Sequence, residues 1–249
     1  MACFFLVLNE RITILEVNNK GVGSTVLYKC IAGFLFIQVN ALRDNYMGKD
    51  EQVLVVPRKT LFSVMPEWNG ICTERVIDCV TLITQAQEFH PRSVMEEDIR
   101  YKQIIPYLVF THEDRYFLMQ RKSDATEVRL RNKYSLGIGG HIRKEDMQGV
   151  TIFDWAKREF EEEVSYQGKY TFETLGLLND DSSPVGQVHM GIVLLVRGDS
   201  SLIKVKSELK SGALYSLQEC LGYYEQLEDW SKYLVDFLVH HTSTLVNAK

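Results

Sequence analysis

The segment TIFDWAKREFEEEV, residues 151–164, limits the fold more than any other part of this chain. Thr151 and Asp154 form the S/T-x-x-D/E signal that marks the start of a helix. The apolar residues recur at helical spacing and form a stripe that would pack against a sheet, at Phe153, Phe160 and Val164. The sequence therefore predicts a helix with one buried stripe, in a fold that also contains strands.

Four glutamates occupy five consecutive positions of this helix. At about 100° per residue, Glu159, Glu162 and Glu163 share one face, whereas Glu161 points to the other side. Uncompensated glutamates one turn apart destabilise a helix by about 0.2–0.5 kcal/mol per pair. A divalent cation would reverse that effect, because hard cations such as Mg²⁺ bind carboxylate oxygens. The run alone fits either a solvated face or a metal site.

Two neighbouring features favour the metal site. The strand pattern YSLGIGGHI, residues 134–142, ends in Gly139 and Gly140, where the backbone turns tightly or approaches a ligand closely. Arg158 directly precedes the first glutamate and can orient a carboxylate through bidentate hydrogen bonds.

These residues resemble the Nudix box, G-x5-E-x7-R-E-U-x-E-E-x-G-U, in which U is a bulky apolar residue. Residues 158–163 match R-E-U-x-E-E without a gap, and Gly139 and Glu145 match the opening G-x5-E. The segments KQIIPYLVF, NKYSLGIGGHI and LGLLNDDSSPVGQVHMG are similar to those of a bacterial Nudix subgroup with an N-terminal extension. The resemblance covers about residues 47–249.

The resemblance implies an α+β Nudix fold, with a mixed β-sheet sandwiched between helices and a small N-terminal module. It implies a metal-dependent hydrolase that cleaves a diphosphate linkage in a nucleoside diphosphate derivative. A polyanionic diphosphate would be repelled by the carboxylates unless cations lay between them, so Mg²⁺ or Mn²⁺ is the expected cofactor. The expected metal ligands are Glu159, Glu162, Glu163 and Gly140, and the same glutamates with Arg158 are the expected catalytic residues. Glu159 is either a ligand or the general base.

Two departures from the box bear on activity. Twelve residues separate Glu145 from Arg158 where the family has seven, so the loop before the helix is five residues longer. Ser165 replaces the closing glycine. If that position needs φ > 0, serine would be strained, and the helix could instead continue towards Gly168. Neither departure removes a carboxylate of the core motif.

Further candidates lie around the box. The expected substrate-binding residues are Gly139, Arg121, Arg129 and His141, and the expected extra carboxylates are Glu145 and Glu208. Each side chain outside the box has a structural role as an open alternative. Glu208 and the arginines, including Arg131, could be ordinary surface residues. His141 and His189 could be structural histidines with satisfied hydrogen bonds, and Tyr107 and Tyr134 could belong to the core.

Charge and composition limit the classes of substrate and partner that we expect for this protein. The net charge of −5 and the absence of a basic stripe argue against nucleic acid, so a small nucleotide-like molecule is the expected substrate. Five cysteines form no CxxC pair, which fits buried thiols in a reducing compartment. The longest apolar runs fall short of the roughly 20 residues that span a membrane. We therefore expect a cytoplasmic protein with no membrane partner, and a homodimer is left open.

The chain divides into three regions. Residues 1–46 are apolar and irregular, and are interpreted as a lineage-specific extension or a product of start-codon choice. Residues 47–100 are interpreted as a small module that starts with a strand ended by Pro57 and finishes in the charged connector HPRSVMEEDIRYK. Residues 101–249 form the expected Nudix domain.

Within that domain, five further elements are predicted. Two apolar runs joined by THEDR indicate a hairpin, and two more indicate later strands. A final helical pattern ends the chain. The predicted ranges are 104–110 and 116–121 for the hairpin, 170–178 and 188–196 for the strands, and 228–241 for the helix.

A catalytically weak or inactive Nudix-fold module that binds nucleotides is the alternative function. Ser165 and the longer loop are its support. A strict metal requirement for turnover favours the enzyme, whereas ligand binding without metal favours the module.

Overall fold

The computed structural model describes residues 2–8, 11–18, 21–29, 50–123, 130–147, 151–206 and 209–247. The chain falls into two compact units, Met1–Asp50 and Glu51–Lys249. None of the helices in these described ranges is long and apolar enough to cross a membrane.

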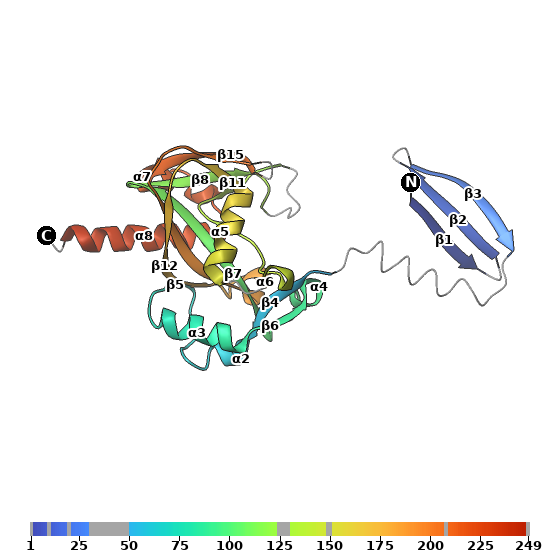
Figure 1. The fold of residues 1–249 in the computed structure, drawn as a ribbon, viewed down its shortest axis with the longest axis horizontal. Coiled ribbons are helices and arrows are strands. Elements are labelled where there is room, and N and C mark those ends of the chain that lie inside the picture. The colour runs from blue at the N-terminus through green and yellow to red at the C-terminus, as the bar shows by residue number, and fades with distance from the viewer. Residues whose placement is uncertain are drawn as a thin grey trace. The chain divides into compact units, whose positions relative to one another are not determined.

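The first unit contains a three-stranded antiparallel sheet, in the order β1, β2, β3 (Figure 1). The strands are β1 (Ala2–Leu8), β2 (Arg11–Asn18) and β3 (Gly21–Lys29). Ala2 pairs with Val17 and Leu8 with Arg11, so β1 and β2 form a hairpin. These strands contain many Ile, Val and Thr side chains, which favour extended structure.

The second unit contains both helices and strands. Its strands are β4 (Gln52–Pro57), β5 (Gly70–Cys72), β6 (Glu88–Pro91), β7 (Tyr101–His112), β8 (Arg115–Arg121), β9 (Tyr134–Ser135), β10 (Ile138–Gly139), β11 (Val164–Tyr166), β12 (Tyr170–Asn179), β13 (His189–Gly198), β14 (Ile203–Val205) and β15 (Leu209–Ser216). Its helices are α2 (Arg58–Leu61), α3 (Val76–Ala86), α4 (Arg92–Met95), α5 (Ile152–Glu163), α6 (Pro184–Val188), α7 (Leu217–Leu221) and α8 (Asp229–Asn247), with 3₁₀ turns η2 (Lys144–Met147) and η3 (Tyr224–Gln226). The predicted hairpin, the acidic helix, the two later strands and the C-terminal helix are confirmed.

The described strands β4 to β10, β12, β13 and β15 form one mixed sheet, with the path β15-β8-β7-β13-β12-β5. The central pair, β7 and β13, is parallel, and the other neighbours on this path are antiparallel. β7 and β8 pair only beside their turn, at Thr111↔Tyr116 and His112↔Arg115. Beyond the turn, β9 pairs with β8 and β10 pairs with β7. The glycine-rich segment thus fills the space between two diverging strands.

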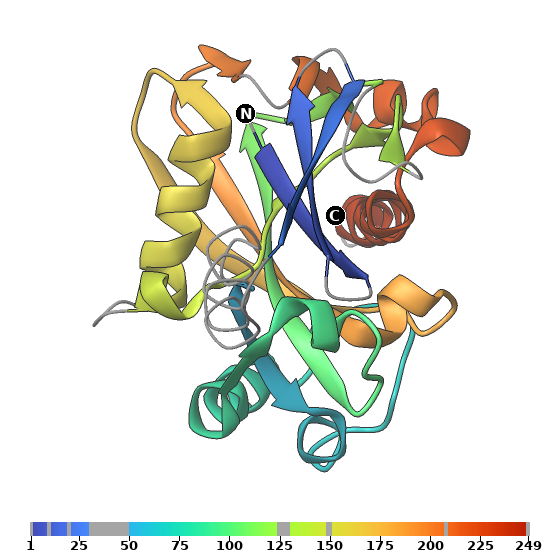
Figure 2. The same ribbon diagram turned by 90° about the vertical axis from the view of Figure 1, so that its right-hand side faces the viewer.

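Two hydrophobic cores cover the two faces of this sheet, as the α+β class requires. Along β7, Leu108 and Phe110 belong to the core under α5, whereas Tyr107 and Val109 belong to the core under α8. Figure 2 shows α5 in yellow and α8 in red on opposite sides of the strands. Each large apolar side chain buried in this way contributes about 1.5–3 kcal/mol. The sandwich of helices around a mixed sheet confirms the predicted fold class.

Residues 51–100 contribute strands to the same sheet as the residues that follow them. Val55 of β4 pairs with Gln103 of β7, and Cys72 of β5 pairs with Leu177 of β12. Strands from both sides of the predicted division at residue 100 therefore lie in one sheet. The predicted connector also holds the end of β6 and all of α4.

The acidic helix has the predicted start and end but differs from its prediction in the side chains that it buries. Thr151 and Asp154 form the expected capping box. Phe153, however, is 43% exposed, and Trp155 and Ala156 join Phe160 in the core instead. The helix ends at Glu163 and does not continue towards Gly168.

Ser165 lies in strand β11, where it pairs with Lys204 of β14. Its φ is outside the left-handed region. The strain considered for serine at this position is therefore absent, because the chain enters a strand there and does not turn back.

Candidate active site

A pocket with a volume of about 710 Å³ lies between α5, the end of β8, the end of β10 and the start of β13. It brings together eight of the predicted site residues, which are Arg121, Gly139, Gly140, His141, Arg158, Glu159, Glu162 and Glu163. Glu161 lies outside this pocket, and its carboxylate accepts a hydrogen bond from the hydroxyl of Tyr170 at 2.9 Å. The separation of the glutamates into two faces thus follows from the helical period.

The second glycine lets a carboxylate lie against the backbone. β10 pairs with β7 through Gly139↔Tyr107, and the chain leaves the strand at Gly140. A Cβ atom added to Gly140 would lie 2.5 Å from Oε1 of Glu159. A side chain at this position would therefore displace the Glu159 carboxylate, which explains in physical terms why glycine occupies the strand end.

Glu159 carries the most perturbed carboxyl group of the pocket. Its pKa is raised to about 7, first by burial and then by the negative charges of Glu163 and Glu162, against the opposing effect of Arg158. The residues that line the pocket also include more acidic than basic side chains. A carboxyl group with a pKa near neutrality can serve as a general base or acid, or can release its proton to bind a cation.

Arg158 holds the neighbouring carboxylate in place. Its guanidinium donates to Oε1 of Glu162 at 2.7 Å and to Oδ2 of Asp146 at 2.9 Å. Asp146 also accepts two hydrogen bonds from Arg143, at 2.8 and 3.1 Å. Burial acts to raise the pKa of Asp146, but the hydrogen bond from Arg143 and the charge of Arg158 bring it below its usual value. η2 and α5 are thereby tied together.

Asp146 was not predicted, and Glu145 does not take the place expected for it. The Glu145 side chain is 62% exposed, lies 4.0 Å from Arg143 and does not line the pocket. The sequence shows two adjacent acidic residues, Glu145 and Asp146, but it does not show which of the two side chains would contact Arg158.

Arg121 lies at the pocket wall in an ion pair. Its Nε donates to Oε1 of Glu228 at 2.7 Å, and Glu228 is itself buried. Arg131 is exposed and does not line the pocket. Arg129 and Glu208 lie outside the described residues.

The two tyrosines have the structural roles that were weighed for them. Tyr107 is buried, and its hydroxyl forms a 2.8 Å hydrogen bond with Ser231 of α8. Tyr134 is half-buried and packs against Tyr223.

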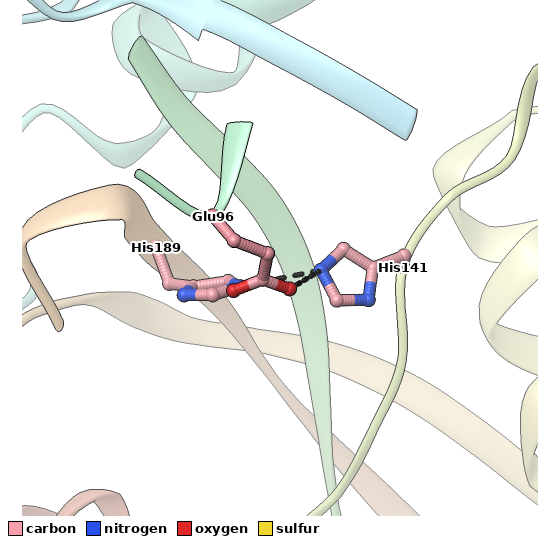
Figure 3. Close-up of side chains that lie close together, drawn as sticks. All are labelled: Glu96, His141 and His189. Carbon is pink, nitrogen blue, oxygen red and sulfur yellow. Dashed lines mark hydrogen bonds and ion pairs between the residues drawn. The ribbon is translucent and has the colours of Figure 1, made fainter. Parts of the chain in front are cut away.

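The two histidines meet in the pocket. Their Nε2 atoms lie 3.2 Å apart, and Oε1 of Glu96 is 3.9 Å from Nε2 of His141 (Figure 3). The pKa of His141 is lowered to about 3, first by burial and then by the neighbouring Arg92 and His189. His141 and His189 were considered separately from sequence, and Glu96 was missed because its segment was interpreted as a connector.

No protein-family model matches the chain. Protein YmaB of Bacillus subtilis is 37% identical to it, over 77% of this chain and 100% of YmaB. The crystal structure of Tm1382, described as a candidate Nudix hydrolase, is 31% identical with a TM-score of 0.65, over 76% of this chain and 99% of Tm1382. The chain belongs to the Nudix hydrolase superfamily. As a Nudix-type hydrolase it is an enzyme by family, and the resemblance seen in its sequence is confirmed.

The Nudix superfamily implies a divalent cation, and the donors of the pocket fit one. Glu159, Glu162 and Glu163 offer carboxylate oxygens, which hard cations select. Burial and the charges of Glu163 and Glu162 raise the pKa of Glu159, so negative charge is crowded at this part of the pocket. A cation among them would balance that charge.

Proposed function

We propose that this Nudix protein hydrolyses a phosphoanhydride linkage in a nucleoside diphosphate derivative and that it needs Mg²⁺ or Mn²⁺ for this reaction. The observation that supports the proposal most is the convergence of Glu159, Glu162 and Glu163 on one pocket beside the Gly140 backbone. The cation would neutralise phosphate charge and activate water.

The residues of the chain would divide the remaining work between them. Glu162 and Glu163 would serve as metal ligands, and Arg158 would fix the orientation of Glu162 through their 2.7 Å hydrogen bond. Glu159, whose pKa is about 7, would be a ligand or the general base, because a base works best when its pKa lies near the working pH. The Gly139–Gly140 backbone would shape the site or add a ligand.

Substrate binding would fall to side chains around the glutamates. Arg121 and His141 line the same pocket and would face the phosphate groups or the moiety joined to them. The pocket volume of about 710 Å³ is in the range of small-molecule sites. A small nucleotide-like substrate therefore suits this pocket better than a polymer.

The proposal is tested by product release from a panel of nucleoside diphosphate derivatives, with Mg²⁺, Mn²⁺ or EDTA. We expect metal-dependent turnover that falls by at least about 100-fold in Glu162→Gln and Glu163→Gln, since even outer-shell partners of a metal are worth about 10–100-fold. Glu161→Gln is the matched control on the opposite face and should keep full activity. Full activity in the two pocket variants, with an intact fold, would refute the metal-ligand roles.

The same experiment separates the enzyme from a binding module. If none of the nucleoside diphosphate derivatives is hydrolysed but nucleotides bind in EDTA, a Nudix-fold module without turnover is favoured. The departure at Ser165 gives that alternative no structural support, because the residue lies unstrained in β11.

We also propose a cytoplasmic location. Cys72, Cys79 and Cys220 are free thiols, which fits a reducing compartment. Detection of the native protein in a cell-envelope fraction, and not in the soluble fraction, would refute this.

A further inference from the structure

Three side chains from separate parts of the chain, of which only His141 has a part in the proposed function, point toward one another (Figure 3). They come from separate places in the sequence: Glu96 at the C-terminal end of α4, His141 directly after the glycine pair, and His189 at the first position of β13. One donor atom from each lies within 4.8 Å of the other two. Two imidazoles and one carboxylate form the donor set of many zinc sites.

The orientation of the His189 ring is fixed by a hydrogen bond of the ring nitrogen that faces away from His141. Its Nδ1 lies 2.7 Å from the carbonyl oxygen of Val185. A carbonyl only accepts, so Nδ1 carries the proton and donates it, and Nε2 presents its lone pair toward His141. Histidines that bind metals commonly use the second ring nitrogen in this way.

We propose that Glu96, His141 and His189 bind a divalent transition-metal ion, Zn²⁺ in first place, with a ligand set that does not include the glutamates of α5. The spacing supports this. Zn–N distances of about 2.0–2.1 Å place two tetrahedral ligands about 3.3 Å apart, and the two Nε2 atoms are 3.2 Å apart. The two imidazoles therefore already have the separation that one ion requires.

Glu96 completes the set after a small movement. Its Oε1 is 3.9 Å from Nε2 of His141, and its side chain is 36% exposed and so has room to change rotamer. Nε of Arg92 donates to the same Oε1 at 3.2 Å. Such a second hydrogen bond is usual for ligating carboxylates, and it leaves the other oxygen for the ion.

The donor types assign different ions to the two sites. Imidazole nitrogen suits Zn²⁺ and other transition ions, whereas an all-carboxylate site suits Mg²⁺ or Mn²⁺. Three protein ligands leave one coordination position, and His141 and His189 both line the pocket. Water or a substrate oxygen could take that position. The inference concerns metal binding in the absence of substrate and does not depend on the proposed hydrolysis.

The test is Zn²⁺ binding to the full-length protein after removal of metals with EDTA and dialysis. Competition with a chromophoric chelator gives the affinity, and visible absorption of bound Co²⁺ reports four-coordinate geometry. The variants are His141→Gln, His189→Gln and Glu96→Gln. Glu162→Gln controls for the glutamate site, and His90→Gln controls for a histidine whose carboxylate partner, Glu88 at 2.7 Å, lies outside the trio. Circular dichroism verifies that each variant is folded.

We expect one Zn²⁺ per chain, with affinity reduced by at least about 100-fold in each histidine variant and unchanged in both controls. The Co²⁺ absorption should disappear in the same variants. Zn²⁺ binding that persists in both histidine variants, that is lost in Glu162→Gln, or that is absent from the wild-type protein would overturn the proposal. Hydrolysis is not measured, so failure here and failure of the proposed function remain distinguishable.

Discussion

Gly140 has no Cβ atom, and this leaves space for the Glu159 carboxylate. Oε1 is the end of a flexible side chain and can move away at low cost. Gly137, by contrast, faces the buried ring of Tyr107, which Ser231 holds by a hydrogen bond. Two glycines of one short segment should therefore respond differently to the same substitution.

Gly140→Ala should lower metal-dependent turnover by about tenfold or more, because the displaced carboxylate no longer faces the other glutamates. The free energy of unfolding should change by less than about 1 kcal/mol, whereas Gly137→Ala should lose about 1–3 kcal/mol from overpacking. Steady-state kinetics and urea unfolding measure the two effects. Normal turnover in Gly140→Ala would contradict the role given to the close approach.

The pKa of Glu159 makes a prediction about pH for the metal-free protein. Because the folded-state value of about 7 exceeds the ordinary value of 4.5, the protonated carboxyl favours the folded state. Its stability contribution is complete below about pH 4.5 and is lost as pH rises through about 7. In EDTA, Glu159→Gln should exceed the wild-type protein in stability by about 2 kcal/mol at pH 8, and the difference should vanish near pH 4.5.

Urea unfolding at several pH values measures this difference, with Glu161→Gln as the control that should show no such trend. Equal stability of Glu159→Gln and the wild-type protein at pH 8 would show that the carboxylates are solvated and do not crowd one another.

At the scale of elements, α8 supports the glycine-rich segment from the far side of the sheet. Oγ of Ser231 accepts from the backbone N–H of Leu136 at 2.9 Å and bonds the hydroxyl of Tyr107 at 2.8 Å. Ser231 and Leu136 are both fully buried. One hydroxyl thus links α8, β7 and the loop between β9 and β10.

Ser231→Ala should destabilise the protein by about 1–3 kcal/mol, since it leaves the buried N–H of Leu136 without its partner. Ser63→Ala removes an exposed hydroxyl that bonds the carbonyl of Thr60, and should cost less than about 0.5 kcal/mol. Thermal or urea unfolding distinguishes them. If the free energy of unfolding fell by the same small amount in both variants, the hydrogen bonds of Ser231 would contribute little to stability.

Elements whose signals are local were predictable from sequence. The capping box and the helical period placed α5 and separated Glu161 from its neighbours. Elements and contacts that depend on distant partners were not predictable: β6 exists because it pairs with β4, and His141 meets His189 only through the sheet. The inward position of Trp155 in place of Phe153 likewise depends on where the helix rests on the strands.

At the scale of the whole second unit, a charge cluster formed by the buried Lys102 and the partly buried Arg58 and Asp181 joins its early and late parts. Lys102 is fully buried, and its Nζ donates to Asp181 at 2.9 Å. Arg58 of α2 donates to both oxygens of the same carboxylate, at 2.9 and 2.7 Å. Burial acts to raise the pKa of Asp181, but the hydrogen bonds from Arg58 and Lys102 hold it well below its usual range.

Asp181→Ala should destabilise the protein by about 3–5 kcal/mol at pH 7, because it leaves Lys102 buried without its carboxylate. With a depressed folded-state pKa, the contribution of Asp181 is present above its ordinary value of 3.8 and is lost as pH falls below it. Glu67→Ala removes an exposed partner of the same arginine and should cost less than about 1 kcal/mol. Chemical unfolding at pH 7 measures the free energy of unfolding of both variants. Equal losses in the two variants would show that the charge cluster contributes little to stability.

The parallel pairing of β7 with β13 has a consequence for how the molecule forms during synthesis. Gln103 finds its partner His189 only after most of the second unit has left the ribosome. Until then β7 has an open edge of apolar residues, a state in which chains associate wrongly. Contacts between such distant residues also slow folding. The order in which the chain is made therefore delays the pocket until the last central strand is complete, and we expect a nascent chain that ends before β13 to need a chaperone.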